Sequence, residues 1–318
     1  MDHITFATTG NAIDFGDLSV ARKAFIGTGA NPTRGIMGGG SVPGTSNVID
    51  YVSIASAGNA VDFGDLSAAG RYNSNNNTTS RTKMLFGGGP SSNVIESITI
   101  ASTGNPTDFG DLTASKFYVG GTSNSVRVVF AGGGTPTHTN VIEYVTIETS
   151  GNGADFGDLT ATKYGNKGCI SASHGGINQD VLQRPSVNYM PGSGRALFAG
   201  GMIGDDTINR CEMIHIPTLG NGVDFADISS YSQRASYSST TRFFSMGGDN
   251  PNNIIDMVLF SNFGNKSDWG DLTTSPETAP GGCSNSTRGL CYGGGTPSVQ
   301  NVIDYTSLAS TGNAADFG

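Results

Sequence analysis

One phrase of nine residues recurs along the whole chain and constrains its fold more than any other feature. The phrase GNAIDFGDL at residues 10–18 returns six times in altered form, and the last copy ends at the C-terminus as GNAADFG. The first aspartates of the copies are Asp14, Asp62, Asp108, Asp155, Asp224, Asp268 and Asp316, at intervals of 48, 46, 47, 69, 44 and 48 residues. A regular period of this size indicates a repeat architecture with one enlarged repeat.

The enlarged repeat contains an insertion that the other repeats lack. Residues 174–194 read HGGINQDVLQRPSVNYMPGSG and are rich in turn-forming residues. Two interpretations of this segment stay open: a surface loop without fixed structure, or a segment that docks onto a partner.

Each repeat divides into four short segments separated by turn residues. Residues 116–159 contain KFYVGGTSNS, RVVFAGGG, NVIEYVTIETS and ADFGDL. The third segment alternates β-branched and aromatic residues, which is typical of a strand. With 48 Gly and 12 Pro in 318 residues, long helices are unfavourable. Four antiparallel strands per repeat is the size of a propeller blade, so the sequence predicts an all-β chain with a single β-propeller domain over residues 1–318.

The number of strands predicts the number of blades. Full four-strand units run over residues 22–68, 69–113, 116–160, 163–229, 232–274 and 279–318, and the insertion falls in the fourth. Residues 1–18 add one copy of the third and fourth strands. We therefore predict six blades rather than seven, with the ring closed by terminal strands. The stretch from Asp14 to Leu18 is expected in the outer position of the last blade, which leaves the C-terminal copy as a tail or a contact with an adjacent subunit.

The repeat resembles the kelch repeat. The kelch pattern has a glycine doublet after the second strand, as in GGG at residues 38–40 and 87–89, and an aromatic residue on the third strand, here Tyr51, Tyr144 and Tyr305. It also has a basic residue before the first strand, and the chain offers Arg22 or Lys23, Arg71, Lys116, Lys163 and Arg234, with none before the last unit. The fourth-strand aromatics are Phe15, Phe63, Phe109, Phe156, Phe225, Trp269 and Phe317. The resemblance implies a propeller that binds a partner, and we expect the aromatics from Phe63 to Trp269 to be buried between blades.

Charged residues recur with the same period. An acidic residue occupies one position of each third strand: Asp50, Glu96, Glu143, Glu212, Asp256 and Asp304. A second series opens each second strand: Arg34, Arg81, Arg127, Arg195, Arg242 and Arg288. Because these strands are antiparallel neighbours, we predict arginine–carboxylate pairs that order the scaffold.

Neither catalysis nor a cofactor is indicated. The DFG sequence recurs in an array, unlike the single metal-binding DFG of a kinase. The paired aspartates of DFGD diverge along a strand, which favours turn-capping, with bound calcium as the alternative. His3, His138, His174 and His215 are scattered. Cys169, Cys211, Cys283 and Cys291 match no metal motif and are expected as buried small hydrophobes, with a Cys283–Cys291 disulfide as the alternative.

Composition excludes some partners. Charged residues make up 14% of the chain, the net charge is -9, and no basic stripe is visible, which argues against nucleic-acid binding. No apolar run approaches the ~18 residues of a membrane helix, so no membrane insertion is expected. The first residues, MDHITFATTG, do not have the pattern of a secretory signal.

The connections between second and third strands vary from repeat to repeat, whereas the turns between third and fourth strands are nearly uniform. Propeller topology places the variable loops on one face and the insertion on the other. Variable polar loops are typical of contact surfaces. The candidate binding residues are Ser41, Thr45, Thr137, His138, Asp205, Asp206, Asn250, Asn252 and Gln300.

The composition, low in charge and rich in Gly, Ser, Thr and Asn, is similar to that of degenerate kelch-like arrays in tailed-phage virions and on bacterial surfaces. This resemblance implies a non-enzymatic structural or adhesion module in a virion or on an extracellular surface. Its expected partners are another protein, a further copy of the chain in an assembly, or a host glycan. An intracellular kelch-type scaffold is the alternative, and a carbohydrate-active or oxidase-type propeller enzyme is the third hypothesis.

Overall fold

The computed structural model describes residues 1–22, 27–42, 44–69, 78–89, 92–124, 126–134, 137–162, 168–171, 194–203, 206–231, 234–248, 252–276, 280–295 and 300–318. Regular structure in these ranges consists of β-strands, and no helix among them is long and apolar enough to cross a membrane. The chain divides into two compact units. One contains residues 1–3, 13–169 and 216–222, and the other contains residues 4–12, 170–215 and 223–318.

Three antiparallel sheets follow one another in the first half of the chain. The first has the order β3 (Gly27–Ala30), β4 (Arg34–Val42), β5 (Gly44–Ser53) and β6 (Val61–Asp65). The second contains β7 (Lys83–Gly89), β8 (Ser92–Thr99) and β9 (Thr107–Asp111), and Thr79 forms an isolated bridge to Met84. The third contains β10 (Gly120–Ser123), β11 (Arg127–Ala131), β12 (Val141–Thr146) and β13 (Ala154–Asp158).

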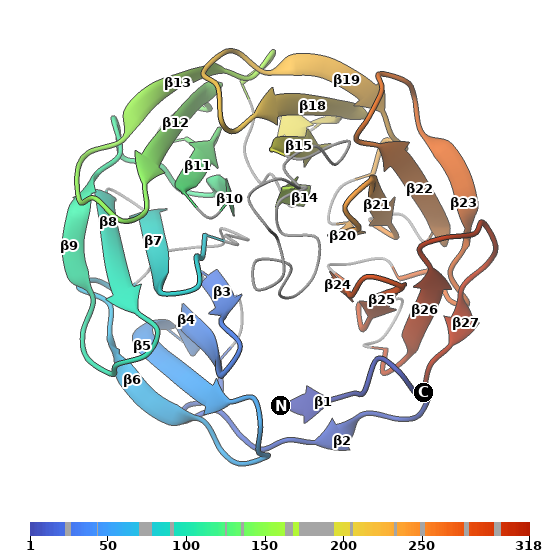
Figure 1. Ribbon diagram of the computed structural model, residues 1–318, viewed down its shortest axis with the longest axis horizontal. Helices are drawn as coiled ribbons and strands as arrows, with labels where there is room; N and C mark the ends of the chain where they lie inside the picture. Colours follow the sequence, from blue (N-terminus) through green and yellow to red (C-terminus); the bar gives the residue numbers. More distant parts are fainter. Residues whose placement is uncertain are drawn as a thin grey trace, which may run out of the picture. The chain divides into compact units, whose positions relative to one another are not determined.

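Three sheets follow in the second half. The fourth contains β14 (Gly168–Ser171), β15 (Arg195–Ala199), β18 (Arg210–His215) and β19 (Val223–Asp227), and the short pair β16 (Met202–Ile203) and β17 (Asp206–Thr207) lies between β15 and β18 in the chain. The fifth contains β20 (Ala235–Ser238), β21 (Arg242–Met246), β22 (Ile254–Leu259) and β23 (Ser267–Asp271). The sixth contains β24 (Gly281–Ser284), β25 (Arg288–Tyr292), β26 (Ile303–Ser307) and β27 (Ala315–Asp316). The predicted all-β, six-bladed propeller class is confirmed (Figure 1).

The core of the protein lies between consecutive blades. One cluster joins Leu85, Ile95 and Phe109 of the second blade to Val128 and Phe130 of the third, together with further aliphatic neighbours. Equivalent clusters join the first blade to the second, the fourth to the fifth and the fifth to the sixth. Phe63, Phe109, Phe225 and Trp269 belong to these clusters. The predicted burial of the fourth-strand aromatics is confirmed, with 3% exposure each for these four residues and for Phe156.

One main-chain hydrogen bond recurs between consecutive repeats. The carbonyl of the fourth-strand aromatic accepts the N–H of the residue at the TGN glycine position of the next repeat. The donor–acceptor pairs are Gly58–Phe15, Gly104–Phe63, Gly151–Phe109, Gly220–Phe156, Gly264–Phe225, Gly312–Trp269 and Gly10–Phe317, at 2.6–3.3 Å. At Gly110, with φ of +150°, a Cβ would lie 2.3 Å from the Gly151 carbonyl oxygen. At Gly110 the neighbouring main chain occupies the space of a side chain, whereas the fourth blade has Ala226 at the equivalent position.

The N-terminal hairpin is placed differently from the prediction. The C-terminal copy, β27, takes the outer position of the last blade, with Asp316 paired to Asp304. The N-terminal copy instead forms its own sheet of β1 (Asp2–His3) and β2 (Ile13–Asp14). The predicted position of Asp14–Leu18 is therefore wrong, and the C-terminal copy is not a tail. The reason is that β26 and β27 are adjacent in the chain, so their pairing closes a short loop at low entropic cost.

Candidate interaction surface

The acidic series of the third strands is buried, and three of its members, Asp50, Glu143 and Asp256, pair with cations other than the predicted arginines. Asp50 lies 2.9 Å from Arg22, and Glu143 pairs with Lys116. Asp256 lies 2.6 Å from Arg234, and Lys266 Nζ lies 2.7 Å from the other carboxylate oxygen. Arg22, Lys116 and Arg234 are the basic residues that precede the first strands, whereas Lys266 precedes the fourth strand β23. Arg71 and Lys163, which hold the same sequence position, lie outside the described residues.

The second-strand arginines have another role, which corrects the prediction for Arg34, Arg127, Arg195, Arg242 and Arg288. Their guanidinium groups donate to carbonyls of the following repeat, at Ile100, Ile216, Phe260, Leu308 and Phe6 respectively. Four of them also lie over an aromatic ring, and Arg34 is 4.5 Å from the centre of the Tyr51 ring.

Strand pairing explains why the predicted arginine–acid pairs do not form. Arg34 is paired opposite Ser53, and Met37 is opposite Asp50. Residues three apart in a strand point to opposite faces, so Arg34 and Asp50 do not share a face.

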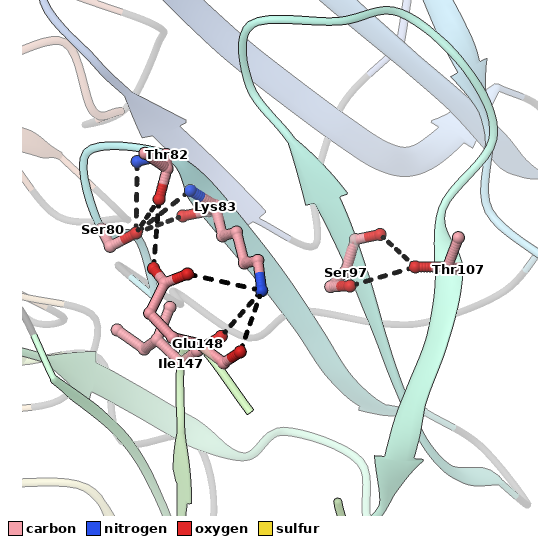
Figure 2. A network of polar contacts seen from close by, with 7 residues as sticks. All are labelled: Ser80, Thr82, Lys83, Ser97, Thr107, Ile147 and Glu148. Carbon is pink, nitrogen blue, oxygen red and sulfur yellow. Dashed lines mark hydrogen bonds and ion pairs between the residues drawn. The ribbon is translucent and has the colours of Figure 1, made fainter. Parts of the chain in front are cut away.

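In the second blade the cation is Lys83 rather than the predicted Arg81. Lys83 pairs opposite Thr99, the position that the arginines hold in the other blades. Figure 2 shows its ammonium group directed at the carbonyls of Ile147 and Glu148, at 3.4 and 3.5 Å, and at the Glu148 carboxylate, at 3.5 Å. Thr82 Oγ1 donates to the same carboxylate at 3.1 Å. Residue type alone predicted Arg81 for this role, but Arg81 precedes Lys83 by two residues and lies outside β7.

Asp304 of the last blade has no basic residue at the equivalent position, as the sequence indicated. Its carboxylate accepts hydrogen bonds from the Thr273 N–H, at 2.9 Å, and from the Thr273 hydroxyl. Burial raises the pKa of Asp304 above its ordinary value, against the effect of these hydrogen bonds. The pKa of Asp256 is lowered, because Arg234 and Lys266 outweigh the opposing effect of burial. The pKa values of these two carboxyl groups, at equivalent positions of two blades, are therefore shifted in opposite directions.

This contrast predicts opposite pH dependences for two matched variants. The free energy of unfolding of the native protein relative to Asp304→Asn should fall as pH rises from about 4, because a raised pKa favours the protonated folded state. Relative to Asp256→Asn it should instead fall as pH drops below about 4, because a lowered pKa favours the ionised folded state. Denaturant unfolding between pH 3 and 6 measures both differences, and slopes of the same sign would contradict this assignment.

The cysteines described by the structure are reduced, and the alternative of a Cys283–Cys291 disulfide is wrong. Cys211 and Cys291 are buried, and Cys283 is half-buried. In the β24–β25 pair Cys283 lies opposite Leu290, and Cys291 lies opposite Gly282, so the two cysteines are not cross-strand partners. Burial raises the pKa of Cys283 to about 11 and that of Cys291 to about 12, which keeps both thiols protonated and unreactive at neutral pH.

The first aspartate of DFGD caps a turn, as the sequence favoured over calcium. Its carboxylate accepts the N–H two residues later in the repeats of Asp14, Asp62, Asp108, Asp268 and Asp316, at 2.9–3.2 Å. The second aspartate contributes its own N–H to the asparagine of the next TGN turn, as from Asp111 to Asn152 at 3.0 Å. Within the described ranges no cluster of three or more metal-ligating side chains occurs.

The candidate binding residues fall into three groups. Thr45, Thr137 and Asp206 are exposed, whereas Ser41, His138 and Gln300 are half-buried. Asn252 is buried, which removes its side chain from the surface. Asp205, Asn250 and residues 174–193 of the insertion lie outside the described residues, so their predicted roles remain predictions.

Main-chain pairing within a blade holds three of the variable loops in place. Strands β4 and β5 continue past the blade as a hairpin, with Ser41 paired to Thr45. In the third blade Gly134 bridges to His138, and the Thr139 N–H donates to the Gly133 carbonyl at 2.8 Å. In the fourth blade β16 and β17 pair through Met202–Thr207 and Ile203–Asp206. The variable connections of the first, third and fourth blades are thus held by three different pairing patterns.

Sequence reasoning missed a set of exposed apolar side chains at the turns between third and fourth strands. Phe263 is 62% exposed, although its ring lies 5.0 Å from the Phe225 ring. Its companions near the same turns are Ile13, Val61, Leu219 and Val223. The sequence carried a signal for them, because Ile13, Val61 and Val223 directly precede DF, and Leu219 and Phe263 directly precede GN, where other copies of the repeat have small or polar residues.

No protein-family model and no curated protein matches the chain. Its resemblance to the kelch repeat therefore stays a proposal.

Proposed function

We propose that the protein is a non-enzymatic structural or adhesion module of kelch-like type, associated with a virion or an extracellular surface, which binds another protein or a host glycan. The contrast between a repeated frame and its variable loops supports this function. The same main-chain hydrogen bond joins every pair of consecutive repeats, whereas β4–β5, Gly134–His138 and β16–β17 each hold a differently built connection. Loops that vary on a constant scaffold are the usual carriers of recognition.

The shifted titratable groups have structural partners, which supports binding rather than catalysis. Arg234, whose pKa is lowered by burial, pairs with Asp256. Tyr237, whose pKa is raised by burial, shares a hydrogen bond of 2.5 Å with Thr306. A catalytic acid or base requires contact with substrate, and these groups are enclosed between blades.

The loop assignment can be tested with two matched triple variants on a glycan microarray. Thr45→Ala, Thr137→Ala and Asp206→Ala together change the exposed loop residues. Ser56→Ala, Thr149→Ala and Asp224→Ala change a similar set of exposed side chains elsewhere. The loop variant should lose about tenfold or more in apparent affinity for any glycan bound by the native chain, and the control should bind as before. Equal binding of both variants would contradict the loop assignment.

Virion association has a separate test. Mass spectrometry of purified particles from a culture that expresses the chain should detect it in stoichiometric amounts with other particle proteins. Recovery in the soluble cell fraction alone would favour the intracellular scaffold instead.

A further inference from the structure

The N-terminal hairpin is half a blade. In complete blades the third strand lies between the second and the fourth, as β5 lies between β4 and β6. The equivalent strand here is β1, and its sheet consists of β1 and β2 (Figure 1). Among the described residues, β1 therefore has one paired edge and one open edge, and open edges accept further strands.

The existing half keeps the contacts of a complete blade toward the first blade. The Gly58 N–H donates to the Phe15 carbonyl at 2.6 Å, as in the other repeats. His3 packs edge-on against Phe15 with ring centres 5.5 Å apart, and Tyr51 packs in the same way against Phe63 at 6.0 Å. The two strands of the half-blade thus already make the contacts that the third and fourth strands make in a complete blade.

Two polar groups of β1 lack the partners that their counterparts have. Asp2 corresponds to Asp50, which is enclosed by Arg22 and Ser19, but Asp2 is exposed. His3 corresponds to Tyr51, which lies beneath the Arg34 guanidinium. The His3 Nδ1 atom is buried without a hydrogen-bond partner.

In the first blade, Ile54 lacks the contacts that its counterparts in the second and third blades have. The carbonyls of Ile100 and Ile147 accept from Arg34 and Lys83 of the preceding blades. Ile54 holds the equivalent position, and no described residue donates to its carbonyl. Its side chain is 46% exposed, whereas Ile100 and Ile147 are fully buried. An inner pair of strands is needed to supply both the cation and the apolar cover.

We propose that the half-blade is an acceptor site for a β-hairpin from a separate polypeptide that carries the pattern of the first two strands of a blade. This hairpin has a lysine or arginine before its first strand to meet Asp2. An arginine opens its second strand, lies over His3 and donates to the Ile54 carbonyl. Two residues later a large aliphatic side chain covers Ile54. Charge complementarity at Asp2 and continuity with the inter-blade core specify this occupant, independently of the loop binding proposed above.

The chain itself provides the probe. A synthetic peptide with the sequence of residues 113–134 contains Lys116, Arg127 and Val129. In the third blade Lys116 pairs with Glu143, and Arg127 donates to the Ile216 carbonyl. The Val129 side chain is fully buried. Isothermal titration of the full chain with this peptide should show saturable one-to-one binding. Hydrogen exchange should show new protection of the amides of residues 2–5.

Matched changes identify the contacts. A peptide with Arg127→Gln should bind about tenfold more weakly or worse, since a charge-assisted hydrogen bond and a ring contact are lost. Asp2→Asn in the protein should weaken binding of the native peptide to a similar extent, whereas Asp224→Asn, which removes the same charge from another exposed site, should not. Melting curves of the two variants establish that each is folded.

Three results would overturn the proposal. They are no binding at peptide concentrations up to about 1 mM, equal binding of the two peptides, and a concentration-dependent dimer of the protein that the peptide does not dissociate. The last result would show that a second copy of the chain covers the open edge.

Discussion

Lys116→Met should lower the free energy of unfolding by about 3–5 kcal/mol, because it leaves a buried carboxylate without its cation. The Lys116 side chain is 4% exposed and that of Glu143 is fully buried. The Thr113 N–H, at 2.6 Å from the second carboxylate oxygen, would be the hydrogen-bond donor that stays in place. Denaturant unfolding at pH 7 measures the loss.

A surface pair provides the control. Lys83→Met removes a cation whose partner Glu148 is 61% exposed, so its expected cost is about 0–1 kcal/mol. Adding Glu143→Gln to Lys116→Met should recover part of the loss, because no buried charge remains. If Lys116→Met cost no more than Lys83→Met, the pair would not be the buried contact described above.

Phe109→Ala should cost about 3–5 kcal/mol, because it opens a cavity between the second and third blades. The ring lies in a cluster with Leu85, Ile95 and Val128, and it is 3% exposed. The main-chain hydrogen bond from Gly151 to the Phe109 carbonyl remains available to the variant, so the loss reports the packing of the side chain.

Phe263→Ala is the matched control, since the same side chain is removed from a site that is 62% exposed. Its expected effect is within about 0.5 kcal/mol. Thermal or denaturant unfolding of both variants decides the matter, and equal losses would show that the fourth-strand aromatics do not form the core.

The repeat predicted the blade and its core because each feature depends on contacts that every copy makes. The spacing of Asp62, Asp108 and Asp155 marks the outer strand, and the aromatic that follows each aspartate is buried as expected. The turn role of Asp62 and Asp108 followed from local sequence alone. Candidate loop residues were predictable as variable positions, but their exposure was not, and Asn252 is buried.

Pairing partners were less predictable, because they depend on strand register and on competition between similar segments. The series of Arg34 and Asp50 has the right period for pairing, yet the β4–β5 register and the alternation of faces along each strand determine which groups meet. The two terminal hairpins are similar in sequence. Only chain connectivity, which brings β27 directly after β26, decides which of them completes the last blade.

The hydrogen bond between consecutive repeats joins main-chain atoms, as from the Gly104 N–H to the Phe63 carbonyl. A substitution in a variable loop therefore leaves the joint between neighbours chemically unchanged. Each blade can diverge in what it displays without a compensating change in the blade beside it. Recombination that exchanges or copies whole repeats would likewise join compatible ends, so such a gene can gain new combinations of loops by exchange between its own repeats.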